Sequence, residues 1–379
     1  MRSPGSSATE SADPRWLLAC FPLDALRAAA AQLIVLHHLS VYGPIAEAMH
    51  GLFPLLSGWL YDYGRMAVQV FLVLGGYLSA RALSAQEPQL RRSAPALLAQ
   101  RYWRLVPPFM AAVGLTLLAS WLVQPLLPEL VPTQVHLTQI LAHALLLHDL
   151  MSVEALTVGA WYVAIDFQLF ALLLLVMWGL RCLPLTRASR QWMAPAVVGA
   201  LCAASLLKFN RMADMDAYAI YFFGAYGLGV LLYWCQGWAP AARRAGLLAL
   251  GGLMVVALAL QFRERLVVAA LTAVVIVMWR RGTLPAWFER RGQAPVQAMA
   301  RHAYALFLVH FPVCLLVNAI YEHRAESPAP MLDALAPLAL VAAWFLSNLA
   351  ALPFHRWIEA PLLRWRPRAA VLPQGVAVR

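Results

Sequence analysis

The feature that most constrains this chain is its series of long, uncharged apolar stretches, with the charged residues gathered between them. Each stretch is close to the ~20 residues with which an α-helix crosses ~30 Å of hydrocarbon. Hydrophobic residues make up 62% of the sequence and charged residues only 12%, against about 45–50% and 25% in an ordinary soluble domain. We therefore predict an all-α fold, a polytopic membrane helical bundle with about ten transmembrane helices.

Apolar runs separated by polar residues locate the predicted spans. They lie near residues 20–42, 66–84, 105–125, 160–180, 192–208, 217–235, 245–262, 266–280, 303–321 and 334–355. Together they form one transmembrane domain over 16–365, with a disordered cytoplasmic tail at 1–15 and a second cytoplasmic tail at 366–379. The weakest part of the pattern, 126–159, predicts an amphipathic helix on the outer membrane surface, and a re-entrant segment is the alternative.

The distribution of basic residues predicts the orientation of the bundle. Crossing the membrane at each span places 23 of the 29 basic residues on one side and six on the other. Because basic residues concentrate in cytoplasmic connections, the arginine-rich side and both termini are predicted to be cytoplasmic. This asymmetry accounts for the net charge of +11, so we predict membrane lipid as a partner and no nucleic acid.

Several classes of site are not indicated by the sequence. The five cysteines are odd in number, widely separated and mostly within or beside apolar runs, so we predict neither a disulfide framework nor a metal site. The sequence contains no Walker-type loop, dinucleotide fingerprint, HExxH motif or nucleophile elbow. An ATP-driven transporter is therefore not expected.

The first predicted span carries polar groups that are expensive in lipid. Arg27 and His38 are eleven positions apart, which is three helical turns plus ~20°, so both lie on one face, ~16 Å apart along the axis. Asp24 shares that face. The span therefore presents a salt bridge near the cytoplasmic boundary and an imidazole deeper in the membrane. Alternatively, Arg27 extends to the interface and His38 makes an ordinary interhelical hydrogen bond.

The fourth predicted span carries a second group of polar side chains. Trp161, Asp166 and Gln168 fall within eight residues of one another. An acidic side chain in this position is expected to face the interior of the bundle. We predict that Asp166 holds a cation or a ring N–H, and a purely structural pair with an arginine is the alternative.

Two arginines lie at the predicted cytoplasmic mouth of the third span. Arg101 and Arg104 are three residues apart, so they share a helical face and are suited to holding phosphate groups in bidentate pairs. The alternative is anchoring against anionic lipid. His310, which precedes Phe311 and Pro312 in the ninth span, is less informative, because a lone histidine beside a helix kink is more often a packing residue.

Six segments, in this order, resemble motifs of the membrane acyltransferase 3 family. They are LDALRAAAAQLIVLHH, YGRMAVQVFLVLGGYLSARAL, RYWRLVPPF, WYVAIDFQLF, HAYALFLVHFPV and FHRWIEAPLLRW, and the resemblance extends over nearly the whole chain. The first motif, an arginine followed after ten residues by a histidine, selects His38 over His37. The sequence departs from the family pattern at Gly75, where serine is usual, at Ala67, where glycine is frequent, and at Asp166, where glutamate is usual.

The resemblance implies a membrane O-acyltransferase in a bacterial-type plasma (inner) membrane. Such an enzyme moves an acyl group, usually acetyl, from cytoplasmic acyl-CoA to a hydroxyl of a glycan or glycolipid at the cell envelope. Many relatives carry a fused extracytoplasmic hydrolase-like domain, whereas only about twenty residues follow Pro361 here. We therefore expect the protein to modify its acceptor directly or to pass the acyl group to a separate extracytoplasmic partner.

The candidate residues then take roles in this reaction. His38 is expected to act as a general base or as a transient acyl carrier, because imidazole exchanges protons near neutral pH. The other predicted catalytic residues are Arg27 and Asp24, as support, and Asp166, which is expected to fix the acceptor or a ring nitrogen of His38. Arg101 and Arg104 are predicted to bind the phosphates of acetyl-CoA or another acyl-CoA. Trp161, Gln168 and His310 are predicted to bind substrate, and no metal is expected.

A different class of function uses the same intramembrane charges. A proton-coupled solute transporter or a glycan flippase would also place Asp, Arg and His side chains inside a helical bundle. Against a transporter, no inverted pair of broken segments is evident in the two halves of the sequence. The sequence indicates neither the identity of the acceptor nor the length of the acyl group.

Overall fold

The computed structural model describes residues 14–86, 90–279, 286–323 and 334–364, and every regular element in these ranges is a helix. Within these described ranges, eight helices are long and apolar enough to cross a membrane, or nine if the bent pair Phe21–Leu39 and Pro44–Leu52 forms one span. This confirms the predicted all-α polytopic bundle of an integral membrane protein. The predicted tails lie outside the described residues, apart from Pro14 and Arg15, with which the first helix begins.

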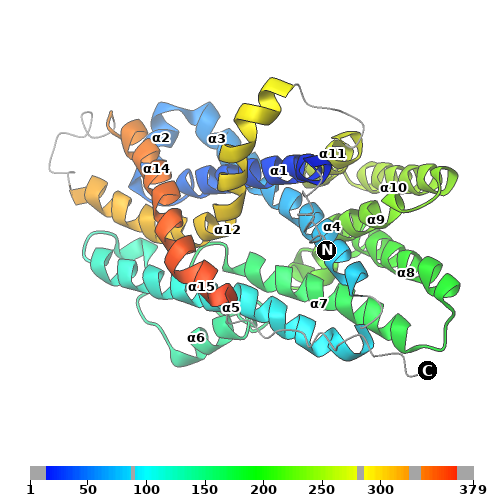
Figure 1. Ribbon diagram of the computed structural model, residues 1–379. Coiled ribbons are helices and arrows are strands. Elements are labelled where there is room, and N and C mark those ends of the chain that lie inside the picture. Colours follow the sequence, from blue (N-terminus) through cyan, green and yellow to red (C-terminus); the bar gives the residue numbers. More distant parts are fainter. Residues whose placement is uncertain (1–13, 87–89, 280–285, 324–333, 365–379) are drawn as a thin grey trace, which may run out of the picture.

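The helices follow one another in the order of the predicted spans (Figure 1). They are α1 (Pro14–Leu39), α2 (Pro44–Leu52), α3 (Pro54–Tyr63), α4 (Val68–Ala85), α5 (Leu90–Val123), α6 (Leu137–Ala144), α7 (Ala160–Cys182), α8 (Arg187–Leu207), α9 (Ala219–Gln236), α10 (Pro240–Leu260), α11 (Glu264–Trp279), α12 (Ala286–His323), α14 (Ala336–Phe354) and α15 (Ala360–Arg364). The predicted span 266–280 corresponds to α11, whose described part has 16 residues. It begins two residues before the predicted span and reaches Trp279, where this described range ends, and it is not among the eight helices counted above.

Helices α4 and α9 pack with their backbones in direct contact. A Cβ atom added at Gly76 would lie 1.9 Å from the carbonyl oxygen of Tyr226, and one added at Gly229 would lie 1.9 Å from that of Val73. Small residues permit such close approach, and association of helices in lipid depends on packing because there is no hydrophobic driving force between them. The glycine motif of the second predicted span therefore fixes α4 against α9.

Two clusters of buried apolar side chains fill the bundle. One is built mainly on α4, α7 and α9, and the other mainly on α5, α12 and α14. Helices α1 and α7 contribute to both clusters: Ile34 and Leu169 belong to the first, and Val35 and Val163 to the second. These two helices therefore run along the boundary, or seam, between the clusters. They also carry polar side chains, among them His38 on α1 and Asp166 on α7.

The chain turns sharply where α1 ends. Helix α2 leaves α1 at an angle of 94°, and Gly43 between them has a φ of +90°, which L side chains rarely adopt. Asn318 of α12 accepts a hydrogen bond from the backbone N–H of Ile45 at 3.0 Å. The turn is thus fixed to α12, and the last turn of α1, which carries His38, is held against that helix.

The stretch 126–159 contains the short helix α6 within mostly irregular chain. Helix α6 exposes Leu137 and Leu141 and buries His143, so it is amphipathic as predicted, although it has only eight residues. The following loop contains Leu146 with a φ of 58° and Ser152 with a φ of 53°. Positive φ is unfavourable for residues with a side chain, so the surrounding contacts must impose this loop conformation.

Candidate active site

His38, on the last turn of α1, lies directly against His310 of α12. His38 Nδ1 and His310 Nε2 are 2.8 Å apart, and the planes of the two rings differ by only 12°. His310 is fully buried, with 0% of its surface exposed. A direct contact between His310 and substrate, which we predicted, is therefore incompatible with its position behind His38, and the ring of His310 supports that of His38 instead.

The hydrogen-bond partners define the tautomers of both rings. His310 Nδ1 lies 2.7 Å from the carbonyl oxygen of Phe307, which can only accept, so this nitrogen carries the hydrogen. The other nitrogen of a neutral imidazole is an acceptor, and His38 Nδ1–H therefore donates to His310 Nε2. This leaves a lone pair on His38 Nε2, as a general base requires.

His38 also lines a cavity of about 610 Å³. Tyr42, Arg65 and Tyr162 contribute to its wall, together with residues 129–132 and 154–159. The segment 126–159 and Arg65 belong to connections that the charge pattern predicts to be on the outer side. The cavity has the volume of a small-molecule site, which is typically ~300–1,000 Å³, and it combines aromatic rings with a few charged groups.

A second cavity, of about 670 Å³, adjoins the first. The two share Arg65, Asp149 and Trp161 in their walls. The indole of Trp161 stacks on Phe222, with ring centroids 5.4 Å apart and planes 26° from parallel. Arg265 and further aromatic side chains line the second cavity, so both adjoining cavities combine aromatic and charged groups.

An ion pair inside the bundle connects α5 to α7. Arg101 places its Nη2 atom 2.6 Å from both carboxylate oxygens of Asp166, and the two side chains are only 16% and 12% exposed. The guanidinium group also lies over the ring of Phe170, 5.1 Å from its centroid. Asp166 therefore pairs with an arginine, and it lines neither cavity and makes no hydrogen bond to His38. The expected role in fixing His38 is not supported.

The arginines predicted to bind the donor lie near one another. Arg104 interacts electrostatically with Arg27 as well as with Arg101, and its side chain is exposed, unlike that of Arg101. Asp24 lies in the electrostatic field of Arg27 and Arg301. However, Asp24 and Arg27 make no ion pair within 4.0 Å, so the salt bridge expected from their spacing is not formed.

The remaining predicted substrate residues have different environments. Trp161 stands between the two cavities, in a position to contact a ligand. The side chain of Gln168 instead accepts a hydrogen bond from the Ala219 N–H at 3.0 Å and donates to the Ala217 carbonyl at 3.2 Å. It therefore fixes the beginning of α9, and it lines neither cavity.

The structure adds residues to the site that the sequence motifs did not single out. Tyr42 lies beyond the end of the first motif, and its ring centroid is 6.1 Å from that of His38. Tyr162, which belongs to the polar group of the fourth predicted span, lies one helical turn before Asp166 and also lines the cavity. His37 is also at the cavity, but its Nδ1–H donates to the Leu60 carbonyl at 2.9 Å. That bond gives His37 a structural role in holding α3.

Asp149, which both cavities share, follows a buried histidine. His148 is 0% exposed, and its ring stacks on His143 with centroids 4.3 Å apart. Burial lowers the pKa of His148 to about 4, and burial also raises the pKa of Asp149. His148 is therefore neutral at pH 7, and its ring packs as an uncharged wall beneath the loop that carries Asp149.

Metal ligation is not indicated by the described part of the chain. In those ranges, no three His, Cys, Asp or Glu side chains are placed to hold a metal ion. The four described cysteines are free, and Cys202, Cys235 and Cys314 are buried. The chemistry of the site therefore rests on imidazole, guanidinium, carboxylate and phenol groups.

Comparison with protein families identifies the chemistry of this arrangement. The acyltransferase 3 model, described as an acyltransferase domain, matches residues 22–352. The chain belongs to the acyltransferase 3 family. The protein is therefore an acyltransferase enzyme, and the matched region contains the His38–His310 pair, the Arg101–Asp166 pair and both cavities. No curated protein and no solved structure matches the chain.

Proposed function

We propose that this acyltransferase moves an acyl group, with acetyl the simplest case, from acyl-CoA to a hydroxyl of a glycan or glycolipid. His38 is the general base. The observation that carries the proposal is the position of His38, with its Nδ1 atom bound to His310, in the wall of a cavity of about 610 Å³. Membership of the family supplies the reaction, and the tautomers of the histidine pair supply the base.

In the proposed step, His38 Nε2 takes the proton of the acceptor hydroxyl while the acceptor oxygen attacks the thioester carbonyl carbon. The tetrahedral intermediate collapses as the C–S bond breaks, and the proton on His38 passes to the leaving sulfur to give free CoA thiol. Throughout, His310 accepts the Nδ1–H of His38 and holds the ring in one orientation, as the third group of a triad does. An acyl-imidazole route would use the same Nε2 atom.

The negative charge that develops on the carbonyl oxygen needs hydrogen-bond donors. Tyr42 and Tyr162 line the cavity together with His38. Their phenol groups are the donors that we assign to this role. The Tyr162 backbone lies on α7 one turn from Asp166, so the Arg101–Asp166 pair stabilises the helix segment that presents this donor.

The donor is proposed to enter from the arginine-rich side, which the charge pattern assigns to the cytoplasm. Arg27 and Arg104 interact electrostatically, and Arg104 is exposed, so both are suited to CoA phosphates. Arg101 keeps a buried Nε atom without a hydrogen-bond partner beside its bond to Asp166. From Arg27 to His38 the distance along α1 is ~16 Å, which a thin pantetheine arm is suited to span.

The acceptor is proposed to bind in the two adjoining cavities. The Trp161 indole between them offers an apolar platform, and Arg65 and Asp149 offer polar partners to the hydroxyl groups of a sugar. We propose that the acceptor approaches from the outer face of a bacterial-type inner membrane. It is either the final glycan or a separate extracytoplasmic carrier of the acyl group.

The proposal is tested by measuring the rate at which the protein in nanodiscs releases free thiol from acetyl-CoA. The rate is measured with and without an envelope glycan fraction. Removing a general base reduces the rate by about 10²–10⁴-fold, so we expect a loss of this size in His38→Gln. His50→Gln is the matched control, because His50 is exposed on α2. A folded His38→Gln protein with the wild-type rate would exclude His38 as the general base. A separate comparison of the acetyl content of envelope glycans, with and without the protein, identifies the acceptor.

A further inference from the structure

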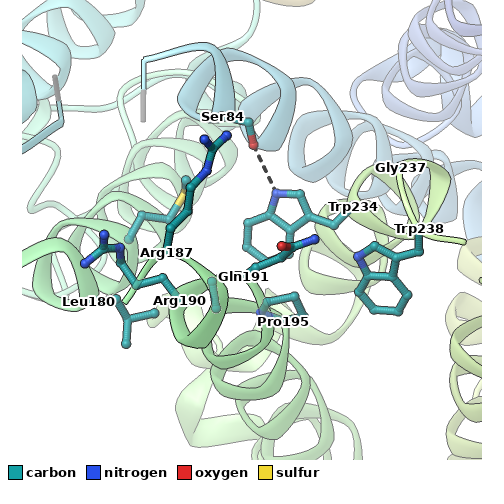
Figure 2. Close-up of a pocket in the computed structure, with 11 residues that line it drawn as sticks. Ser84, Leu180, Arg187, Arg190, Gln191, Pro195, Trp234, Gly237 and Trp238 are labelled. Carbon is teal, nitrogen blue, oxygen red and sulfur yellow. Dashed lines mark hydrogen bonds between the residues drawn. The ribbon is translucent and has the colours of Figure 1, made fainter. Parts of the chain in front are cut away.

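A third cavity, of about 360 Å³, lies away from the His38 site, where α4, α7 and α9 end and α8 begins (Figure 2). These helix ends belong to the arginine-rich side of the bundle. None of the residues that line this cavity lines either of the two cavities near His38. Its ligand therefore differs from the acceptor that those cavities are proposed to bind.

Basic and amide side chains from α8 form one wall of this cavity. Arg187 and Gln191 are four residues apart and so share a helix face. Figure 2 shows Arg187 extending toward Ser84 of α4, and Gln191 lines the same cavity as Trp234. The lining contains no acidic residue, and Arg187 makes no ion pair within the described part of the chain. Among the described residues, the cavity therefore carries positive charge without a counterion.

Arg190, on the other side of the same wall, also has unused donor capacity. Its Nη1 atom donates to the carbonyl oxygen of Leu185 at 2.6 Å, which fixes the guanidinium group in place. Its Nε atom is buried and has no hydrogen-bond partner. Because a buried donor without a partner is unfavourable, this group calls for an acceptor that the described protein atoms do not supply.

The opposite wall is aromatic. The Nε1–H of Trp234 donates to Ser84 Oγ at 3.1 Å, which fixes that indole, and Trp238 lies beside Trp192 with ring centroids 5.6 Å apart. Trp192 is 56% exposed. Indole rings and arginines together are typical of the depth at which lipid headgroups lie, and the apolar side chains of Leu180 and Pro195 complete the lining.

We propose that this cavity binds the anionic phosphate ester of a membrane lipid headgroup. Arg187 and Gln191 hold phosphate oxygens, Arg190 adds its free Nε–H, and the apolar and indole groups contact the glycerol and the first methylenes. Acyl-CoA carries the same phosphate chemistry, but the exposed indole of Trp192 beside Trp238 favours a ligand already in the membrane. The inference does not depend on the acyl-transfer step.

Native mass spectrometry of the delipidated full chain, titrated with phosphatidylglycerol, phosphatidylcholine or CoA, tests this site. We expect Arg187→Gln with Arg190→Gln to weaken phosphatidylglycerol binding about tenfold, which is the loss of roughly one charge-assisted contact. Phosphatidylcholine, whose choline cation offsets the phosphate charge, is expected to bind the wild-type protein more weakly than phosphatidylglycerol does. The matched control is Arg243→Gln with Arg244→Gln, which removes the same charge from the beginning of α10 outside the cavity.

Three outcomes would overturn the proposal. Equal loss of phosphatidylglycerol binding in both double variants would indicate a general attraction to positive charge, and wild-type binding in both would show that the cavity holds no anionic lipid. If the Arg187→Gln/Arg190→Gln variant lost binding of CoA alone, the cavity would be a site for the phosphates of the acyl donor instead. If Arg190→Gln disturbs the fold, the single variant Arg187→Gln replaces the double variant in the titration. Because Arg187 is exposed, we expect this single variant to keep the wild-type melting temperature.

Discussion

The Arg101–Asp166 pair allows a quantitative prediction about a charge inside the bundle. The two side chains are 16% and 12% exposed and are joined at 2.6 Å. Removing one partner of a buried pair leaves the other charge without compensation and costs about 3–5 kcal/mol. The small remaining exposure favours the lower end, so we expect Asp166→Asn and Arg101→Met each to lose about 3 kcal/mol. The double variant Arg101→Met/Asp166→Leu is expected to be near neutral, because both replacements are apolar.

The stability of these three variants is compared by their apparent melting temperatures, which tryptophan fluorescence reports in detergent. One kcal/mol corresponds to about 2–4 °C in chains of moderate size, so each single variant is expected to melt several degrees below wild type and the double variant close to it. Asp62→Asn is the control, because Asp62 is exposed. Single variants as stable as this control, or a double variant no more stable than the single ones, would refute the reasoning.

The same double variant separates a structural role of Arg101 from a role in donor binding. If Arg101 holds a CoA phosphate through its remaining N–H groups, the KM for acyl-CoA stays raised about tenfold even where stability is restored. Arg104→Gln is expected to raise that KM without affecting stability, since its side chain is exposed. A wild-type KM in the double variant would restrict Arg101 to pairing with Asp166.

Three further predictions follow from individual contacts. His310→Phe keeps a ring behind His38 but removes the acceptor of its Nδ1–H, so kcat is expected to fall about 10²-fold at nearly unchanged KM; a wild-type kcat would contradict this. Gly76→Ala places a Cβ 1.9 Å from the Tyr226 carbonyl oxygen, so we expect little folded protein in size-exclusion chromatography, whereas Gly58→Ala, with open space around it, is expected to fold normally. Burial lowers the pKa of His148 in the folded protein to about 4, whereas a histidine in the unfolded chain has a pKa of ~6.5. As pH falls, His148 is therefore protonated in the unfolded chain before it is protonated in the folded protein. Stability is therefore expected to decline from pH ~6.5 toward 4, and the melting temperature of His148→Phe should decline less; equal declines would contradict the assignment.

The spans were predictable from the sequence because lipid imposes a local rule. Every backbone polar group in hydrocarbon must be satisfied within its own helix, so apolar runs of sufficient length define helices directly. The sharp turn after α1 was not predictable in this way. It depends on a positive φ at Gly43 and on Asn318, which is far away in the sequence.

The site was predictable only where its geometry is local to one helix. The spacing of Arg27 and His38 fixes a common face of α1. The motif that contains both selects His38 over His37, and the ring of His37 is bound to the Leu60 carbonyl. The partners of these residues depend on which helices are neighbours. For that reason the spacing of residues in the sequence could not predict three contacts. These are the bond between His38 and His310, the pair of Arg101 with Asp166, and the bond by which Gln168 fixes the beginning of α9.

The position of the histidine lone pair constrains both possible routes of acyl transfer. Whether His38 acts as a base or carries the acyl group, the thioester carbonyl must come within reach of Nε2 at the same cavity that receives the acceptor. The proposed donor phosphates bind about three turns away along α1. The pantetheine arm must therefore follow the seam between the two apolar clusters, where α1 and α7 run. Ile34 and Phe307 line the cavity beside His38, so we expect these two side chains to limit the acyl length that the enzyme accepts.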